Sequence, residues 1–127
     1  KQMGFNILAG PPEVGLPASG LFASDRLIKE NPLVVKRTLR ALIKANRFIA
    51  ENPQETIRVM VKWVPQPPEI AARSYDLELK AISKDGQMTD AEMEILIERL
   101  SEKKRPLDEV RDFSHVRQAL KELDANK

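Results

Sequence analysis

A row of basic residues between positions 32 and 50 is the part of this sequence that comes closest to a binding surface. Its members recur at helical spacing and so share one side of a predicted helix, with Arg37 beside them: Lys36, Arg40, Lys44 and Arg47. No acidic residue lies between Pro32 and Ala50. Such a row could contact an anion, a membrane surface or a nucleic acid.

Two observations favour a simpler interpretation of this row. Nucleic-acid sites tend to interleave cations with aromatic residues, and aromatic residues are absent from this face. The chain holds 19 acidic residues against 21 lysines and arginines, and its formal net charge is only +2. We therefore interpret the row as a solvated face that is neutralised by acids elsewhere, and we predict no nucleic-acid partner.

Residues 81–92, AISKDGQMTDAE, resemble the twelve-residue calcium loop of EF-hands in part. Five positions are acceptable: Ser83, Asp85, Gly86, Met88 and Glu92. The first position fails, because Ala81 has no side-chain oxygen for a cation that requires six or more. An Asp-Gly turn followed by a helix-capping box explains the same residues, so we predict no metal ion here.

His115 is the single histidine, and the chain has no cysteine with which it could complete a transition-metal site. Catalysis by this imidazole would need a partner, and Asp112 is the candidate that lies near it in sequence. The sequence shows no nucleophile motif, phosphate-binding loop or spaced set of metal ligands. We predict no catalytic residue, no metal and no cofactor, and we identify no ligand-binding residue.

Length and composition indicate a single folded unit over residues 1–127. The hydrophobic fraction is 42% and the charged fraction 31%, as in ordinary globular proteins. Aromatic residues make up only 5%, so the core must consist mainly of aliphatic side chains. No apolar run approaches the roughly 20 residues that span a bilayer.

The stretch from Asn31 to Val64 organises the predicted fold. Asn31 and Asn52 suit the N-cap position, and Pro32 and Pro53 suit the first position of a helix. We predict helices over 32–51 and 53–64, a short helix over 26–30, and further helices after Pro68, Thr89 and Ser114, with a helical turn between 107 and 113. Helices thus extend from about 25 to 124.

The apolar spacing also predicts the core. The first long helix presents a stripe of Val35, Leu39, Leu42 and Ile49, widened by Val34, Ala45 and Phe48. The last helix presents Val116, Ala119, Leu120 and Leu123. Trp63 and Tyr75 occupy apolar faces, so we place both in the core.

Two short apolar runs within 4–23 predict strands, at Gly4–Ala9 and at Gly20–Ala23. The predicted fold is therefore mainly α with one or two short β-strands. A chain that opens on a strand without a visible partner suggests a piece of a longer protein, so we expect a single partial domain. Unpaired strand edges and uncovered apolar faces further predict self-association.

The order of several short motifs is similar to a known family. They are Phe5–Leu8, Gly15–Pro17, Ser19–Leu21, Ser24-Asp25, Glu30–Pro32, Glu51–Pro53, Lys62-Trp63, Asp85-Gly86, Thr89–Glu92 and Asp112–Ser114. In this order the chain resembles the later part of a periplasmic substrate-binding protein of an ABC importer. The most similar branch is the one that binds nitrate, sulfonates, taurine and thiamine-pyrimidine precursors.

The resemblance implies the C-terminal part of a two-lobed α/β fold that closes on a small molecule and delivers it to a membrane permease. It implies a periplasmic location and no bond chemistry, and it carries over no individual ligand contact. Two other functions remain open from the sequence. One is a small helical interaction module that uses the basic row against an acidic partner, and the other is an enzyme on the same architecture.

Overall fold

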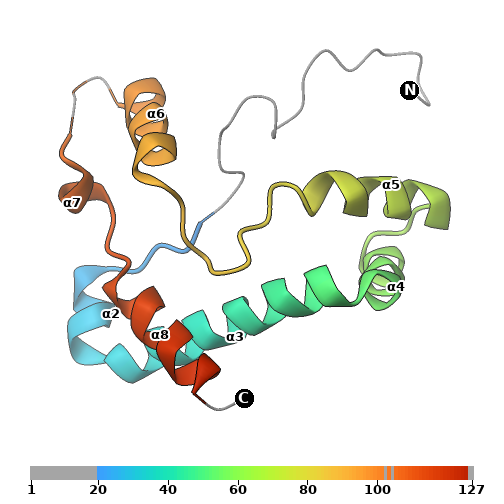
Figure 1. Ribbon diagram of the computed structural model, residues 1–127, viewed down its shortest axis with the longest axis horizontal. Helices are drawn as coiled ribbons and strands as arrows, with labels where there is room; N and C mark the ends of the chain where they lie inside the picture. The colour runs from blue at the N-terminus through green and yellow to red at the C-terminus, as the bar shows by residue number, and fades with distance from the viewer. Residues whose placement is uncertain (1–19, 102, 104, 126–127) are drawn as a thin grey trace.

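A computed structural model of the chain describes residues 20–101, 103 and 105–125. This part of the chain forms seven helices joined by loops, and it contains no strand (Figure 1). The helices are α2 (Asp25–Glu30), α3 (Pro32–Glu51), α4 (Pro53–Trp63), α5 (Pro68–Glu78), α6 (Asp90–Leu100), α7 (Leu107–Val110) and α8 (Ser114–Asp124). The predicted helices are therefore confirmed, with their limits within a few residues.

The predicted strand at Gly20–Ala23 is wrong. These residues have no regular secondary structure, and Phe22 is 97% exposed. A short apolar run becomes a strand only if a neighbour completes its backbone hydrogen bonds, and the described residues offer no such neighbour. The second predicted strand, Gly4–Ala9, lies outside the described residues. Because the described part of the chain is helical without a sheet, the prediction of a two-lobed α/β fold is also overturned.

Proline begins both central helices as predicted, but asparagine does not cap them. Neither Asn31 nor Asn52 caps the following helix through its side chain. The Nδ2 of Asn52 instead donates to the carbonyl oxygen of Phe48 at 3.0 Å. The backbone N–H of Asn52 donates to the same carbonyl oxygen at 2.9 Å. Both groups of Asn52 therefore bind the last turn of α3, and its side chain does not cap α4.

The predicted capping box is present at the start of α6, and a serine side chain caps α2. Thr89 Oγ1 accepts from the Glu92 backbone N–H at 3.2 Å, and Glu92 Oε2 accepts from the Thr89 N–H at 2.7 Å, which is a complete capping box. Ser24 caps α2 by accepting from the Leu27 N–H. Ser114 does not cap the last helix, because it is the first residue of α8 and its N–H donates to Asp112 at 2.7 Å.

The core lies where α8 packs alongside α3 (Figure 1). Ile43 is only 1% exposed, and the other buried members come from α8: Val116, Ala119 and Leu123. The apolar stripe of α8 is thus confirmed. The predicted stripe of α3 omitted Ile43 and included Val34, Leu42 and Phe48, which are exposed. The 11-residue α8 covers only part of the 20-residue α3, so spacing overstates what is buried.

Helices α4 and α5 form a hairpin beyond the C-terminal end of α3 (Figure 1). Tyr75 is buried as predicted, and its hydroxyl donates to the carbonyl oxygen of Ile49 at 2.8 Å, which ties α5 to α3. Trp63 is 76% exposed at the last position of α4, so its predicted place in the core is wrong. None of the helices in the described part is long and apolar enough to cross a membrane.

Candidate functional site

The basic row of α3 faces the acidic residues of α8. Lys36 Nζ and Arg40 Nη1 lie 2.9 and 3.3 Å from the two carboxylate oxygens of Glu122. About two helical turns after Arg40, Arg47 Nη1 lies 3.0 Å from Asp124 Oδ1. The hydrogen bond from Lys36, aided by the positive charges of Lys36 and Arg40, outweighs desolvation and lowers the pKa of Glu122. The predicted neutralisation of the row by acids elsewhere is therefore confirmed for these three bases. The predicted solvation is wrong for them, because only 24–36% of each side chain is exposed.

What remains of the row is discontinuous. Arg37 and Lys44 are exposed on α3, and the paired bases separate them along the helix. The paired bases are partly buried and satisfy carboxylates of the same chain, so an external anion would have to displace Glu122 or Asp124. The row packs α8 onto α3 more than it presents a cationic surface.

The Asp-Gly turn replaces the partial calcium loop. Ser83 Oγ donates to Asp85 Oδ1 at 2.8 Å, and the Gln87 N–H donates to the same carboxylate at 3.0 Å. Gly86 has φ 73°, the left-handed conformation that glycine adopts without strain. Burial raises the pKa of Asp85, but the hydrogen bonds from Gln87 and Ser83 outweigh it and lower that pKa overall. Its oxygens therefore hold the turn closed.

Two further observations concern the predicted absence of metal. Glu92, which would complete a calcium loop, serves the capping box of α6. Among the described residues, no group of three or more histidine, cysteine, aspartate or glutamate side chains is arranged to hold a metal ion.

Asp112 is engaged with the start of α8. Hydrogen bonds from the Ser114 hydroxyl and backbone N–H lower the pKa of Asp112, and the charges of His115 and Arg117 act in the same direction. The carboxylate thus stabilises the first turn of α8, where free N–H groups attract negative charge. The geometry assigns Asp112 a helix-capping role beside His115.

A hollow of about 390 Å³ between α6, α7 and α8 was not identified from the sequence. Its lining consists of three carboxylates, two guanidinium groups and two apolar side chains: Asp90, Asp108, Asp112, Arg111, Arg117, Leu107 and Phe113. These residues come from the start of α6, from α7, from the loop after α7 and from the first turn of α8. They show no periodic spacing, which is why the sequence gives no signal for this hollow.

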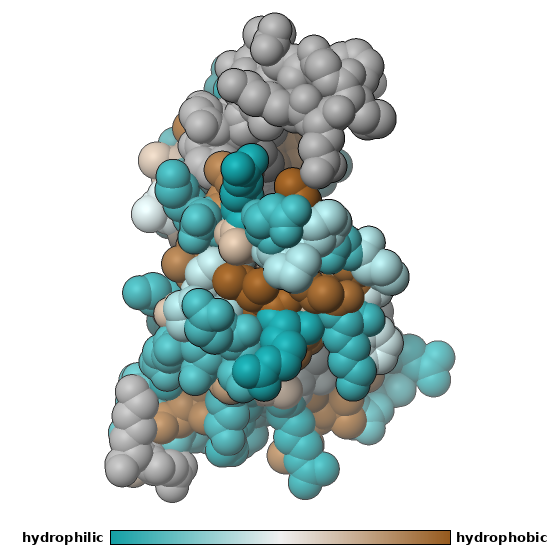
Figure 2. All heavy atoms as spheres, turned by 90° about the vertical axis from the view of Figure 1, so that its right-hand side faces the viewer, coloured by the Kyte–Doolittle hydropathy of each residue, from teal (hydrophilic) through white to brown (hydrophobic). Residues whose placement is uncertain are grey.

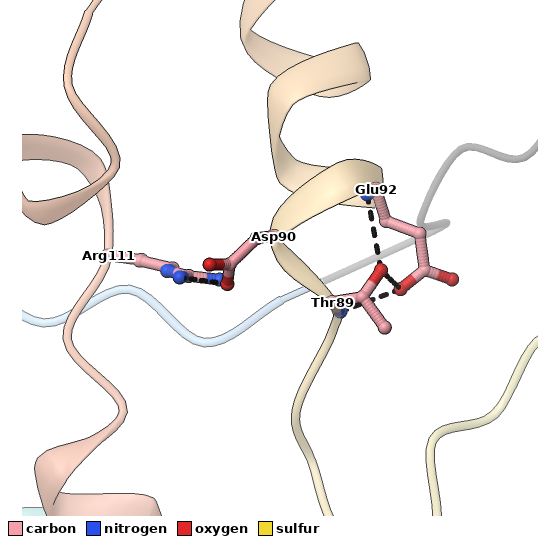
Figure 3. A network of polar contacts seen from close by, with 4 residues as sticks. All are labelled: Thr89, Asp90, Glu92 and Arg111. Atoms are coloured by element: carbon pink, nitrogen blue, oxygen red, sulfur yellow. Dashed lines mark hydrogen bonds and ion pairs between the residues drawn. The ribbon is translucent and has the colours of Figure 1, made fainter.

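Arg111 connects the walls of the hollow. Its guanidinium group forms an ion pair with Asp90 at the start of α6, beside the capping box of Thr89 and Glu92 (Figure 3). Arg111 also lies over the ring of Phe113, 5.3 Å from the centroid, as in a cation–π contact. Only 18% of the Arg111 side chain is exposed, whereas 72% of Asp90 is. Arg111 is therefore the fixed group of the hollow, and Asp90 is its outer partner.

The chemistry of this lining suits binding. Carboxylates and guanidinium groups offer hydrogen-bond acceptors and donors within one concave surface, and Phe113 adds a ring against which a small molecule can pack. The volume is similar to that of small-molecule sites, but the lining is more charged and more open to solvent than the mostly apolar lining of such sites. No serine, cysteine or histidine nucleophile lines this hollow.

Comparisons of the chain with models of known protein families, with characterised proteins and with solved structures found no match.

Proposed function

We propose that this chain acts in solute binding for an ABC-type importer, in the periplasm and without bond chemistry, and that it delivers a small molecule to the permease. The resemblance in the order of the short motifs supports this function. The hollow between α6, α7 and α8 is where we place the solute, because its carboxylates, guanidinium groups and one ring line a concave surface.

The observation that carries the proposal is the way in which the hollow is divided between elements. Asp90 belongs to α6, whereas Arg111 and Phe113 follow α7, so the ion pair between Asp90 and Arg111 joins two walls. A solute that takes over part of this ion pair would change the position of α6 relative to α8. Such a movement of helices around a bound molecule is a form of hinge closure.

An interaction module that uses the basic row is less well supported. Lys36, Arg40 and Arg47 already contact carboxylates of α8. An acidic partner would compete with these internal ion pairs. The internal pairs form within one chain, so they do not incur the loss of translational and rotational freedom that association costs.

Binding at the hollow is tested by thermal unfolding with a panel of small polar solutes, including carboxylates, sulfonates, amines and amino acids. We expect at least one member to raise the unfolding temperature of the wild-type chain, because a ligand stabilises the state that binds it. Arg117→Gln should abolish that shift, since this exposed side chain lines the hollow. Arg73→Gln is the matched control on α5, outside the hollow, and should preserve it.

Two results would contradict the proposal. One is a panel that leaves the unfolding temperature unchanged, and the other is an equal shift in both arginine variants. Delivery is tested separately, by co-purification of the chain with a permease encoded beside it.

A further inference from the structure

The outer face of the α4–α5 hairpin carries hydrophobic side chains that are exposed in the described part of the chain. Figure 2 looks onto the side of the molecule that carries these helices, and it shows a band of hydrophobic side chains bordered above and below by hydrophilic ones. The exposed apolar residues of the hairpin are Val59, Trp63, Val64 and Leu77. A single exposed residue of this kind is common, but a contiguous band with a polar border is typical of an interaction surface.

The charges on this face are divided between the two helices. α4 carries two bases and one acid, and its acid Glu55 already forms an ion pair with Arg58 at 2.8 Å. Lys62 therefore sets the sign of α4 beside Trp63. α5 carries three acids and one base, with Asp76 and Glu78 on either side of Leu77. Counted over all its charged side chains, α4 is therefore net positive and α5 net negative.

This division selects one kind of partner. A partner of uniform charge would attract one helix of the hairpin and repel the other. A second copy of the chain, related by a two-fold axis, brings α4 of each copy against α5 of the other, so that opposite charges meet twice. We propose that the α4–α5 hairpin is the interface of a homodimer, with the apolar band at its centre and Lys62 and Asp76 at its rim. This inference goes beyond the proposed solute binding and does not depend on it.

The size of the face sets the strength of the dimer. Each hairpin helix has 11 residues and so is about 16 Å long. A face of two such helices lies at the small end of specific protein interfaces. We therefore expect a weak dimer whose population depends on concentration, with a dissociation constant in the micromolar range.

Sedimentation equilibrium on the full 127-residue chain, from low to high micromolar concentration, tests the proposal. The wild-type chain should shift from monomer to dimer over this range. Trp63→Glu should raise the dissociation constant at least about tenfold, since buried tryptophans are frequent energetic centres of interfaces. Leu100→Glu is the matched control, because Leu100 is also 76% exposed but ends α6, away from the hairpin. It should leave the dissociation constant within about twofold.

A charge exchange tests the predicted orientation. Lys62→Glu and Asp76→Lys should each weaken the dimer, whereas the double variant should restore it, because each helix would then carry the sign of the other. A wild-type chain that remains monomeric throughout the range would overturn the proposal and leave the face to a different partner. Equal dissociation constants for Trp63→Glu and Leu100→Glu would overturn it as well. Circular dichroism confirms that each variant keeps its helices.

Discussion

The two ends of the molecule, the core between α3 and α8 and the α4–α5 hairpin, differ in how completely their apolar and charged side chains are covered or paired. At the core end, α8 packs along α3 from Lys36 to Arg47, covers Ile43, and supplies Glu122 and Asp124 to the bases of α3. At the other end, the α4–α5 hairpin is attached through its inner side, while its outer side leaves Trp63 and Leu77 in solvent. Helices of similar amphipathic spacing therefore reach different degrees of burial. Spacing shows which side of a helix is apolar, but whether that side is covered depends on the rest of the fold.

The largest effect should appear when a buried side chain of the core between α3 and α8 is shortened, compared with a half-exposed one in α6. Ile43→Ala should lower the free energy of unfolding by about 3 kcal/mol, because it removes a fully buried side chain and leaves a cavity. Ile95→Ala makes the same change at a residue that is 39% exposed, and it should cost at most about 1 kcal/mol. Urea denaturation of both variants measures the difference. Equal costs would show that α3 and α8 do not form the main core.

A smaller loss should follow from Gly86→Ala. A Cβ at this position would lie 3.8 Å from Val116 and 4.0 Å from Ile43, which is ordinary contact, so the cost comes from the left-handed backbone. We expect a loss of about 1–2 kcal/mol in the free energy of unfolding. Gly20→Ala is the control, because its nearest neighbour is 4.0 Å away and its backbone has no positive φ. If both variants were equally stable, the turn would not need a glycine.

A gain is expected at the hairpin end. Thr56 is buried on α4, and within the described residues its hydroxyl has no hydrogen-bond partner. Thr56→Val keeps the shape and removes the unsatisfied group, so it should raise the free energy of unfolding by about 1 kcal/mol. Thr38→Val, at an exposed position of α3, should not. A loss of stability in Thr56→Val would indicate that the hydroxyl has a partner in solution.

The smallest effect should come from the ion pairs of Glu122. Its lowered pKa means that the folded chain favours the carboxylate, so Glu122 adds stability above the usual glutamate pKa of about 4.3. This contribution is lost as the pH falls through the lower pKa of the folded state. Glu122→Gln should therefore be less stable than the wild type at pH 7, and the two should converge in acid. Unfolding curves from pH 7 to pH 3 measure this. If ionisation of Glu122 added no stability, the difference in free energy of unfolding between the two proteins would stay constant over this range.

The sequence predicted where the helices lie better than it predicted which of their side chains are buried. Proline at the first helical position and the Thr89–Glu92 capping box are local signals, and the structure confirms them. The spacing in α8 also identified its buried side, because α3 covers that side completely enough to match the pattern. Local signals succeeded where one element determines the outcome.

Predictions that depended on distant partners failed or were missed. Trp63 has an apolar neighbourhood in the sequence, yet no described element covers it. The run at Gly20–Ala23 lacks the neighbour that a strand requires. The hollow joins Asp90 to Arg111, 21 residues apart, and no short pattern encodes that approach. In each case the outcome depends on whether residues far apart along the chain come into contact.

Amide hydrogen exchange at low and high micromolar concentration tests the contrast between the two ends most directly. Amides of α8 and of the α3 segment around Ile43 should be well protected at both concentrations, because their core forms within one chain. Amides of α4 and α5 should gain protection as the concentration rises, because a second copy then covers the hairpin. Protection in α4 and α5 that equals that of α8 at low concentration, and does not change with concentration, would contradict this contrast.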